Sequence, residues 1–364
     1  MLSAAFESHP LIQYLRDPRT ALKFGVDEWE TLMRVARHGY LSSRVAWLAS
    51  QHSLMEQLPE KIQFHFSSAL RVSESQAISV NWEVAQIRKA FSAASIPFTL
   101  LKGGAYIKGK FAPAPGRLLS DIDIMVPKEQ LDAAERALYA SGWFPTNLNA
   151  YDQRYYREWM HELPPMQHLE RGTTIDLHHT ILPPTALLKP DVAKLWAAVC
   201  PVENEKGVFV LSPVDMVLHS ATHLFHDSEL EHGLRDLVDM DALIRQFSVQ
   251  DSFFEALIER AQILDLSRPL HYALKYCSLF LQTPIPAEVL SRIDAFGSQS
   301  KTIRSVMDQV VSQSIGSILE ERLSVKSRVS LFTMYVRSHY LRMPLRLLIP
   351  HLVRKQFTVE ETVR

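Results

Sequence analysis

The feature of this sequence that most constrains its fold is the run Asp121-Ile122-Asp123, in which two acids flank one apolar residue. Side chains alternate between the two faces of a β-strand, so both carboxylates would point to one side while Ile122 and Ile124 face an apolar layer. Two carboxylates on one face of a strand can share bound cations, and hard divalent metals prefer such oxygen ligands. The run therefore predicts a strand with one apolar face and one cation-binding face.

Two other segments extend this pattern. The apolar segment Pro97–Leu101 predicts a strand, and the run Leu101-Lys102-Gly103-Gly104 ends it with a sharp turn. Glycines there let backbone N–H groups and a helix N-terminus approach phosphate oxygens without a Cβ in the way. A hairpin is predicted from Met166, and its second strand, Thr174-Ile175-Asp176-Leu177-His178, carries a third acid. We therefore expect three carboxylates to meet on adjacent strands: Asp121, Asp123 and Asp176.

Length and composition limit the classes of protein to consider. At 364 residues and 41.6 kDa the chain can form roughly two or three packed units, and 47% hydrophobic with 22% charged residues indicates a helix-rich globular protein. The net charge of −1 gives no general attraction to nucleic acid, which is therefore not an expected partner. The only cysteines, Cys200 and Cys277, exclude a disulfide framework and favour the cytoplasm. No stretch approaches the roughly 20 apolar residues of a membrane span.

The order of these patterns predicts an α+β protein with a short mixed β-sheet and flanking helices. Four regions are expected: helices over 1–80, the sheet and its helices over 81–182, helices alone over 183–322, and a basic amphipathic tail over 323–364. The aromatic and charged segment Tyr151–Met160 is expected to be a loop. A helix is expected to begin at Ser212-Pro213-Val214-Asp215, with serine as N-cap and proline at the first helical position.

Three carboxylates on neighbouring strands suit the transfer of a nucleotidyl group from a nucleoside triphosphate (NTP) to a hydroxyl. This reaction needs charge neutralisation on the phosphates, a deprotonated acceptor and in-line geometry, and two divalent ions about 4 Å apart supply all three. Asp121 and Asp123 can hold both ions, Mg²⁺ or Mn²⁺, and Asp176 can complete the site that activates the acceptor oxygen. Lys102 and Arg117 are natural phosphate partners, with ordinary solvated bases as the alternative interpretation.

Together with Arg117 and the run Ser120-Asp121-Ile122-Asp123-Ile124, these segments resemble the polymerase-beta nucleotidyltransferase superfamily. The resemblance is to its poorly characterised bacterial branch, nucleotidyltransferase family 5, and covers about Glu28 to Leu243. It implies that residues 81–182 form the nucleotidyltransferase core. It also implies that the protein moves a nucleoside monophosphate from an NTP to a hydroxyl of a small molecule, or of a peptide or protein side chain, and releases pyrophosphate.

The resemblance also implies residue roles. Gly103 and Gly104 would lie beside the triphosphate, Asp121 and Asp123 would bind both metals, and Asp176 would bind the catalytic metal next to the acceptor. Many members of the superfamily have Gly-Ser in place of Gly103-Gly104, so a serine hydroxyl on the phosphate is missing here. Ser120 or Arg117 can compensate for it.

Helical spacing also puts Asp215, His219, His223 and His226 on one face of a helix, where they can form a metal site, an acid–base relay or a polar domain interface. Candidate residues on the acceptor side are His219, His223, Arg235 and Asp236. The pair His226-Asp227 offers a lesser alternative, a metal-dependent phosphohydrolase. That architecture gathers its ligands from separate helices, whereas the histidines here crowd into one.

The tail from Leu323 to Val359 contains seven basic residues and no acidic residue, interleaved with apolar ones. Such a segment can lie on anionic lipid at the membrane periphery or contact an acidic protein, or its bases can simply cover helices packed on the body. Pro344 and Pro350 are expected to interrupt any long helix there. The tail also supports a non-enzymatic hypothesis, a catalytically silent scaffold or partner-binding protein with the same fold.

Overall fold

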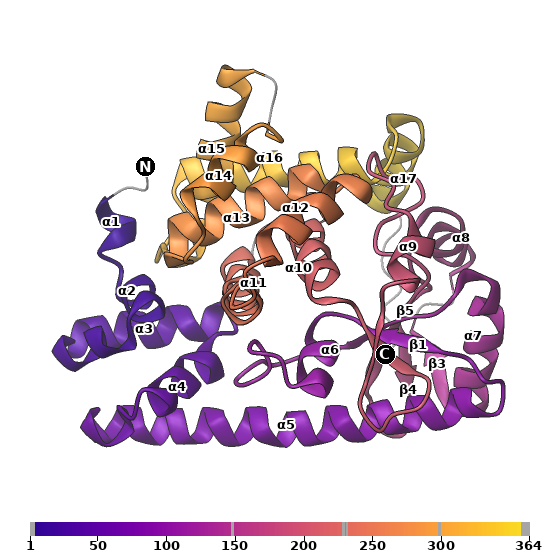
Figure 1. The fold of residues 1–364 in the computed structure, drawn as a ribbon, viewed down its shortest axis with the longest axis horizontal. Coiled ribbons are helices and arrows are strands. Elements are labelled where there is room, and N and C mark those ends of the chain that lie inside the picture. Colours follow the sequence, from indigo (N-terminus) through magenta and orange to yellow (C-terminus); the bar gives the residue numbers. More distant parts are fainter. Residues whose placement is uncertain (1–3, 147–148, 228–229, 231, 298–299, 358–364) are drawn as a thin grey trace.

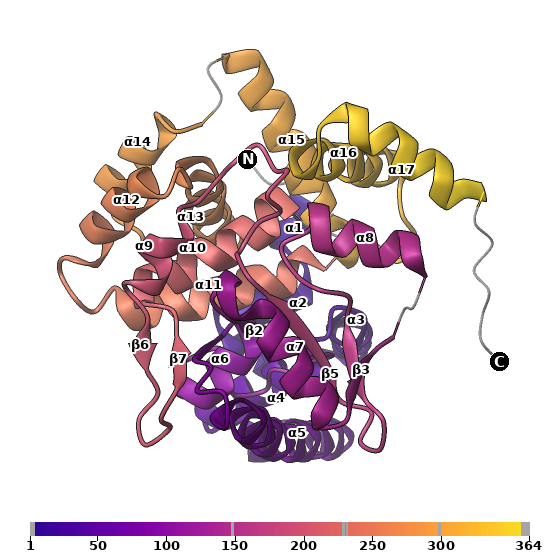
Figure 2. The same ribbon diagram turned by 90° about the vertical axis from the view of Figure 1, so that its right-hand side faces the viewer.

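A mixed β-sheet lies between a long helix, α5, and the C-terminal helices in the computed structural model (Figures 1 and 2). The structure describes residues 4–146, 149–227, 230, 232–297 and 300–357. This arrangement confirms the α+β class with a short mixed sheet and flanking helices. The sheet has seven strands in the order β3-β4-β5-β2-β1-β7-β6.

The N-terminal region consists of short helices that lead into α5. Their bounds are α1 Ala4–Glu7, α2 Pro10–Arg16, η1 Pro18–Lys23, α3 Val26–His38, α4 Ser42–Gln51 and η2 Met55–Gln57. In α3 the apolar residues at helical spacing, Trp29, Leu32, Val35 and Ala36, are buried. Helix α5, Glu60–Ser92, is a single helix of 33 residues that runs along one side of the molecule (Figure 1).

The central strands pair as the apolar pattern requires. Their bounds are β1 Phe98–Leu100, β2 Ile122–Met125, β3 Trp143–Pro145, β4 Met166–His168, β5 Thr174–His178, β6 Cys200–Pro201 and β7 Val208–Val210. Strands β4 and β5 form the predicted antiparallel hairpin, while β2 runs parallel to β5 and antiparallel to β1. The expectation of helices alone after residue 183 was wrong, because β7 pairs in parallel with β1 and buries Val208 and Val210. This long-range pairing has no local signature in so short a segment.

Short helices cover the sheet and join its strands: α6 Lys102–Gly109, η3 Lys128–Gln130, α7 Leu131–Ala140, α8 Ala150–Trp159 and α9 Val192–Trp196. The expectation of a loop over Tyr151–Met160 was wrong, because this segment is the helix α8. Asn149 caps it by accepting a hydrogen bond from the backbone N–H of Tyr151, and the ring of Tyr155 stacks on His351 with centroids 4.4 Å apart. The aromatic residues thus make tertiary contacts that stabilise a helix.

The remaining chain is helical: α10 Pro213–Thr222, η4 His223–Asp227 (a π-helical turn), α11 Gly233–Phe247, α12 Phe253–Ile263, α13 Ser267–Leu281, α14 Ala287–Asp294, α15 Lys301–Gly316, η5 Ser317–Leu319, α16 Val325–Arg342 and α17 Leu345–Phe357. Helix α10 begins at the predicted residue, where the Ser212 side chain accepts a hydrogen bond from the backbone N–H of Asp215. The buried Asp215 carboxylate in turn receives two hydrogen bonds from Arg260 of α12, at 2.7 and 2.8 Å. This pair anchors α12 to the start of α10.

The tail forms the helices α16 and α17. Pro344 separates them as predicted, but Pro350 lies inside α17, where it removes one backbone hydrogen bond without ending the helix. Arg337 points inward and donates to the carbonyl of Phe225 at 2.7 Å. The outer face of α16 carries large exposed apolar side chains: Val325, Val329, Phe332, Val336 and Tyr340. No helix within the described ranges is long and apolar enough to cross a membrane.

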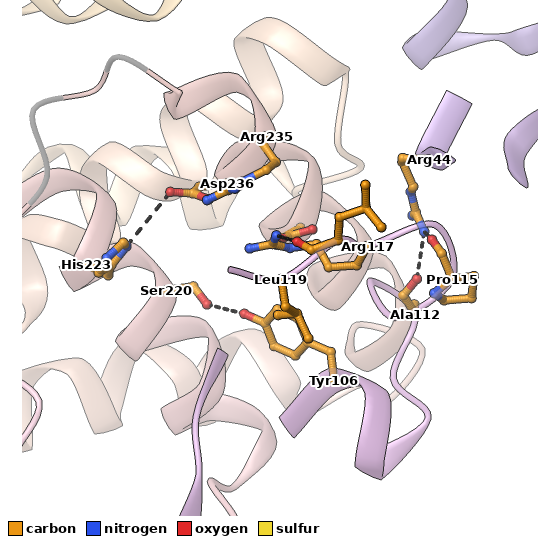
Figure 3. A network of polar contacts seen from close by, with 12 residues as sticks. Arg44, Tyr106, Ala112, Pro115, Arg117, Leu119, Ser220, His223, Arg235 and Asp236 are labelled. Carbon is orange, nitrogen blue, oxygen red and sulfur yellow. Dashed lines mark hydrogen bonds and ion pairs between the residues drawn. The ribbon is translucent and has the colours of Figure 1, made fainter. Parts of the chain in front are cut away.

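Residues 110–121, called loop 110–121 below, connect α6 to β2 and are held from three helices. Arg44 of α4 donates to the carbonyls of Ala112 and Pro115, at 2.9 and 3.2 Å (Figure 3). The side-chain amide of Gln76 in α5 pairs with the backbone N–H and carbonyl of Leu119, at 2.8 and 2.7 Å. From α11, the side-chain carbonyl of Gln246 accepts a hydrogen bond from the Ala112 N–H at 2.7 Å. The loop is thus a fixed part of the fold.

Gly116 allows this loop to lie against α4. It has φ +74°, and a Cβ at this position would lie 2.5 Å from the carbonyl oxygen of Ser43 and 2.7 Å from the backbone of Arg44. Gly172 has a similar φ of +69°, but nothing lies within 4 Å of a Cβ there. Replacing each glycine by alanine therefore separates two costs: both substitutions introduce backbone strain, and only the one at Gly116 adds steric overlap with α4.

We predict that Gly116→Ala destabilises the protein more than Gly172→Ala. Both substitutions force alanine into the left-handed region, at a cost of about 1–2 kcal/mol, and only Gly116→Ala adds overpacking against backbone atoms, about 1–3 kcal/mol more. Urea unfolding of both variants measures the difference. Equal losses would show that the loop does not rest on α4 as described.

Candidate active site

The predicted carboxylates lie on one face of the sheet. In the parallel register of β2 and β5, Asp123 is the direct partner of Asp176, so their side chains project from neighbouring strands to the same side. Asp121 lies one residue before β2 and lines a cavity next to Asp123. The structure therefore brings these three residues to one region, although Asp176 lies far from Asp121 and Asp123 in the sequence.

The ammonium group of Lys102 occupies part of the space between the acids. Its Nζ donates to Asp123 Oδ1 at 2.9 Å, and its charge interacts with Glu162 and Asp121 as well. Lys102 begins α6 and has φ 43°, a left-handed conformation that strains a residue with a Cβ. Burial lowers the pKa of Lys102, but Asp123 and then Glu162 and Asp121 outweigh that effect, so the net shift is upward. The lysine is held as a cation among carboxylates.

His178 is the second cationic partner of Asp123. Its Nε2 lies 3.1 Å from Asp123 Oδ1 and 3.4 Å from Glu162 Oε2. Burial raises the pKa of Asp123, but Lys102 and His178 outweigh it and hold that pKa well below its usual value. Burial lowers the pKa of His178, and its carboxylate neighbours raise it to a net upward shift. Asp123 is thus an anion that already attracts positive charge.

Asp176 shows the opposite behaviour. Burial, followed by the charges of Asp123, Glu162 and Asp121, raises the pKa of Asp176 to about 8. Its Oδ1 is buried and has no hydrogen-bond partner among the described residues. A buried carboxylate oxygen without a donor is costly unless the group is protonated or a cation binds it. The acids therefore fit a site for divalent ions: Asp121, Asp123 and Asp176.

Other ligand groups in this region were not identified from the sequence. Within the described part of the chain, one group of potential metal ligands has all its ligand atoms within 4.8 Å of one another, namely His161, Glu162 and His178. The carboxylate oxygens of the three aspartates do not all lie within this distance of one another. Such a separation agrees with the electrostatic repulsion between carboxylates. His179, next to His178, instead contacts the carbonyl of Met160 at 3.2 Å.

A cavity of about 140 Å³ opens beside Asp123, between the start of α6, loop 110–121 and the helices α10 and α11. It contains most of the residues predicted for the nucleotide and acceptor sides. Its lining consists of Lys102, Gly103, Tyr106, Arg117, Leu119, Ser120, Asp121, Asp123, Ser220, His223, Arg235, Asp236 and Asp239. Gly104, Asp176 and His219 lie outside this lining.

The two glycines of the predicted phosphate turn differ in their surroundings. A Cβ on Gly103 would overlap the side chain of Leu119, so the absence of a side chain lets loop 110–121 approach α6. At Gly104 a Cβ would make ordinary contacts, 3.5 Å to Ile122 and 3.6 Å to Leu100. The close approach therefore requires glycine only at Gly103.

Arg117 is not an ordinary base exposed to solvent, because its guanidinium already pairs with a carboxylate. Its Nε donates to Asp239 Oδ2 at 2.7 Å, and both side chains are largely buried at the cavity wall. Burial lowers the pKa of Arg117, but Asp239 and Asp236 outweigh it, so the net shift is upward. The pair joins loop 110–121 to α11, a contact that spacing in the sequence does not reveal.

The opposite wall comes from α10, η4 and α11. Tyr106 and Ser220 share a hydrogen bond of 2.7 Å between their hydroxyls, and His223 Nδ1 lies 3.8 Å from Asp236 Oδ2 (Figure 3). Arg235 contacts the same carboxylate through Oδ1 at 3.3 Å. The wall thus presents basic and acidic groups side by side.

The predicted histidine stripe does not form a metal site among the described side chains. His219 is buried, and burial and then Lys102 hold its pKa well below its usual value, so it is a neutral imidazole. His226 is also buried, and the side chain of Asp227 lies outside the described ones. The structure therefore gives no support to the phosphohydrolase alternative.

We predict that the metal-free protein loses stability as pH rises from about 5 to 8. Asp176 keeps its proton up to about pH 8 when folded but has an ordinary pKa of 3.8 when unfolded, so the folded state binds more protons in this interval. Thermal unfolding in a chelator measures the trend. Asp176→Asn should flatten it, while Asp251→Asn, at an exposed acid, should not. An unchanged slope in Asp176→Asn would contradict the assignment.

Comparison with known proteins agrees with this geometry. The family model described as uncharacterised nucleotidyltransferase matches residues 26–282, from the start of α3 to just past the end of α13. The matched segment contains the sheet, loop 110–121 and every residue of the cavity lining. No curated protein and no solved structure matches the chain. As the resemblance in the sequence implied, the chain belongs to the family of uncharacterised nucleotidyltransferases.

Proposed function

We propose that the protein is a metal-dependent nucleotidyltransferase of the polymerase-beta type that moves a nucleoside monophosphate from an NTP to a hydroxyl acceptor and releases pyrophosphate. The observation that carries this proposal is the pairing of Asp123 with Asp176 across β2 and β5, with Asp121 at the adjoining cavity. The family match supports nucleotidyl transfer in general. The metal, the nucleotide and the acceptor are inferred from the residues.

In this proposal the three aspartates would hold two ions, Mg²⁺ or Mn²⁺, which would neutralise phosphate charge and align the attacking and leaving oxygens. The chain has the groups for this task. Asp123 is already an anion, and Asp176 has an oxygen without a hydrogen-bond donor. An ion held by Asp176 would favour the ionised form of this acid, whose carboxylate would then accept the proton of the acceptor hydroxyl or hold that hydroxyl in place.

The start of α6 would receive the triphosphate. Gly103 brings backbone close to the cavity, and the N–H groups of the first helical turn favour an anion. The cavity of about 140 Å³ is small compared with ligand pockets of about 300–1,000 Å³. It therefore suits the phosphates rather than the whole nucleotide. Ser120 is exposed and lines the cavity, and in this proposal it would supply the hydroxyl that Gly104 lacks.

The acceptor would bind toward α10 and α11. His223, Arg235 and Asp236 line the cavity there and can donate to or accept from a polar acceptor. His219, proposed from its spacing, is buried behind this wall and would act only through its neighbours. The groups fit a small polar molecule or a peptide or protein side chain.

Contact of residues 323–359 with a membrane or an acidic protein stays a prediction. It is supported by the exposed apolar side chains of α16, among them Val329 and Phe332, and by the exposed bases Lys326 and Arg328 beside them. Arg337 does not contribute, because it is buried against the carbonyl of Phe225.

We predict that Mn²⁺ and an NTP together raise the melting temperature of the wild-type protein more than either does alone. Asp121→Asn and Asp123→Asn should lose this joint shift, because each removes a carboxylate that would hold the ions. Asp132→Asn, at an exposed acid on α7, is the matched control and should behave as wild type. Thermal-shift titration with each NTP measures the effect. Absence of a joint shift with every NTP would favour the scaffold hypothesis.

Transfer itself is tested by incubating the protein with labelled NTPs and cell lysate, and then separating protein, RNA and small-molecule fractions. Label that appears in one fraction with wild type and not with Asp123→Asn identifies the class of acceptor. Equal labelling by both proteins would contradict catalysis at this site.

We also predict that Lys102→Ala makes the protein more dependent on Mg²⁺. Without Lys102, Asp123 loses its closest cation, which should cost about 3 kcal/mol in the absence of metal. Mg²⁺ should restore more stability than it adds to wild type, because no ammonium group competes for the carboxylate. Lys108→Ala is the matched control, since Lys108 lies on the same helix and pairs at 2.6 Å with Glu205. Equal Mg²⁺ effects in the two variants would contradict the competition.

A further inference from the structure

Two imidazoles and a carboxylate converge beside the aspartates. His161 Nε2 lies 3.8 Å and His178 Nε2 lies 3.4 Å from Glu162 Oε2, and the three ligand atoms are all within 4.8 Å of one another. A tetrahedral ion with bonds of roughly 2.0–2.1 Å separates its ligand atoms by about 3.3–3.4 Å. The three side chains therefore already lie near the spacing that one such ion would impose.

The backbone holds these side chains in place. The segment that carries His161 and Glu162 runs along the end of β5, where Leu163 N–H donates to the carbonyl of Leu177 and His179 N–H donates to the carbonyl of His161, both at 2.9 Å. Glu162 forms a β-bridge with His178. Both histidines are buried, with ring centroids 5.1 Å apart. Little rearrangement is needed to bind an ion, which favours affinity.

The charge around this group also favours a cation. Glu162 interacts electrostatically with Lys102 and with Asp176, so it belongs to the same cluster of acids. Asp123 Oδ1, at 3.1 Å from His178 Nε2, is at the spacing of a fourth ligand. Within this cluster several carboxyl groups face the Lys102 ammonium and the His178 imidazole, and a dication would reduce the repulsion among those that are ionised.

We propose that His161, Glu162 and His178 form a second metal site, for a divalent ion that accepts imidazole ligands, such as Zn²⁺, in preference to Mg²⁺, next to the aspartate site. Imidazole nitrogens suit transition metals, whereas Mg²⁺ requires oxygen ligands. An ion there would share Asp123 with the aspartate site and would fix the orientation of that carboxylate. The proposal concerns metal binding and does not require that the protein transfer nucleotides.

Co²⁺ is a suitable probe, because tetrahedral coordination gives it visible absorption bands that are much more intense than those of Co²⁺ in octahedral coordination by carboxylates and water. Metal-stripped wild type should bind Co²⁺ with these bands, Zn²⁺ should abolish them, and a large excess of Mg²⁺ should not. His161→Ala and Glu162→Gln should each weaken Co²⁺ binding at least about tenfold. His179→Ala is the matched control and should retain the bands, since His179 is buried next to His178 but its ring contacts the carbonyl of Met160.

Other results would overturn the proposal. Glu162→Gln is nearly isosteric and preserves the fold, so unchanged Co²⁺ binding by this variant would exclude the proposed ligands. Absorption bands that are lost in Asp121→Asn but not in His161→Ala would exclude them as well. The Mn²⁺–NTP thermal shift measured on the same variants keeps the two proposals apart. Co²⁺ bands without the thermal shift would support the second metal site and contradict the nucleotidyltransferase proposal. The thermal shift without the Co²⁺ bands would support the nucleotidyltransferase proposal and contradict the second metal site.

Discussion

The parallel pairing of β2 with β5 is the constraint on which both the fold and the site depend. It sets Asp123 beside Asp176, and in the same register it sets Ile122 beside Ile175, in the apolar layer. A slip of one residue would exchange the two faces and place buried carboxylates among apolar side chains. The strand register that buries the apolar side chains is therefore the same register that brings Asp123 and Asp176 together. No further interaction is needed to place these two acids side by side.

The same pairing creates an electrostatic problem, because carboxylates on adjacent strands repel each other. In the metal-free protein Lys102 and His178 offset the charge of Asp123, and Asp176 offsets its own by retaining a proton. If cations bind as proposed, these partners would change: Lys102 would yield space around Asp123, and Asp176 would release its proton. In this proposal the groups that stabilise the acids without metal would compete with it, which would couple metal affinity to stability and to pH.

The sequence was most informative where a pattern is local. The alternation around Asp121 and the hairpin that carries Asp176 predicted the central strands, because the period of two is a property of neighbouring residues. Contacts made across the fold were not predicted: β7 is too short to recognise without its partner β1, and α8 depends on rings that stack on His351. Glu162 was missed for the same reason, since only its bridge to His178 directs it to the acids. Arg117 was placed in the cavity, but its pairing with Asp239 was not foreseen.

The Arg117–Asp239 pair also bears on how the protein is divided. A core that ended near residue 182 would leave Arg117 without its buried carboxylate partner and loop 110–121 without the contact between Ala112 and Gln246. Helix α11 therefore completes the cavity, and the family match extends through this helix to residue 282. The wall made by α10 and α11 lines the same cavity as the start of α6 but contributes none of the three aspartates. In the proposed reaction, variation in these two helices would therefore change the acceptor while the strands that carry the aspartates stay the same. Acceptor choice is thus best sought in these helices rather than in the sheet.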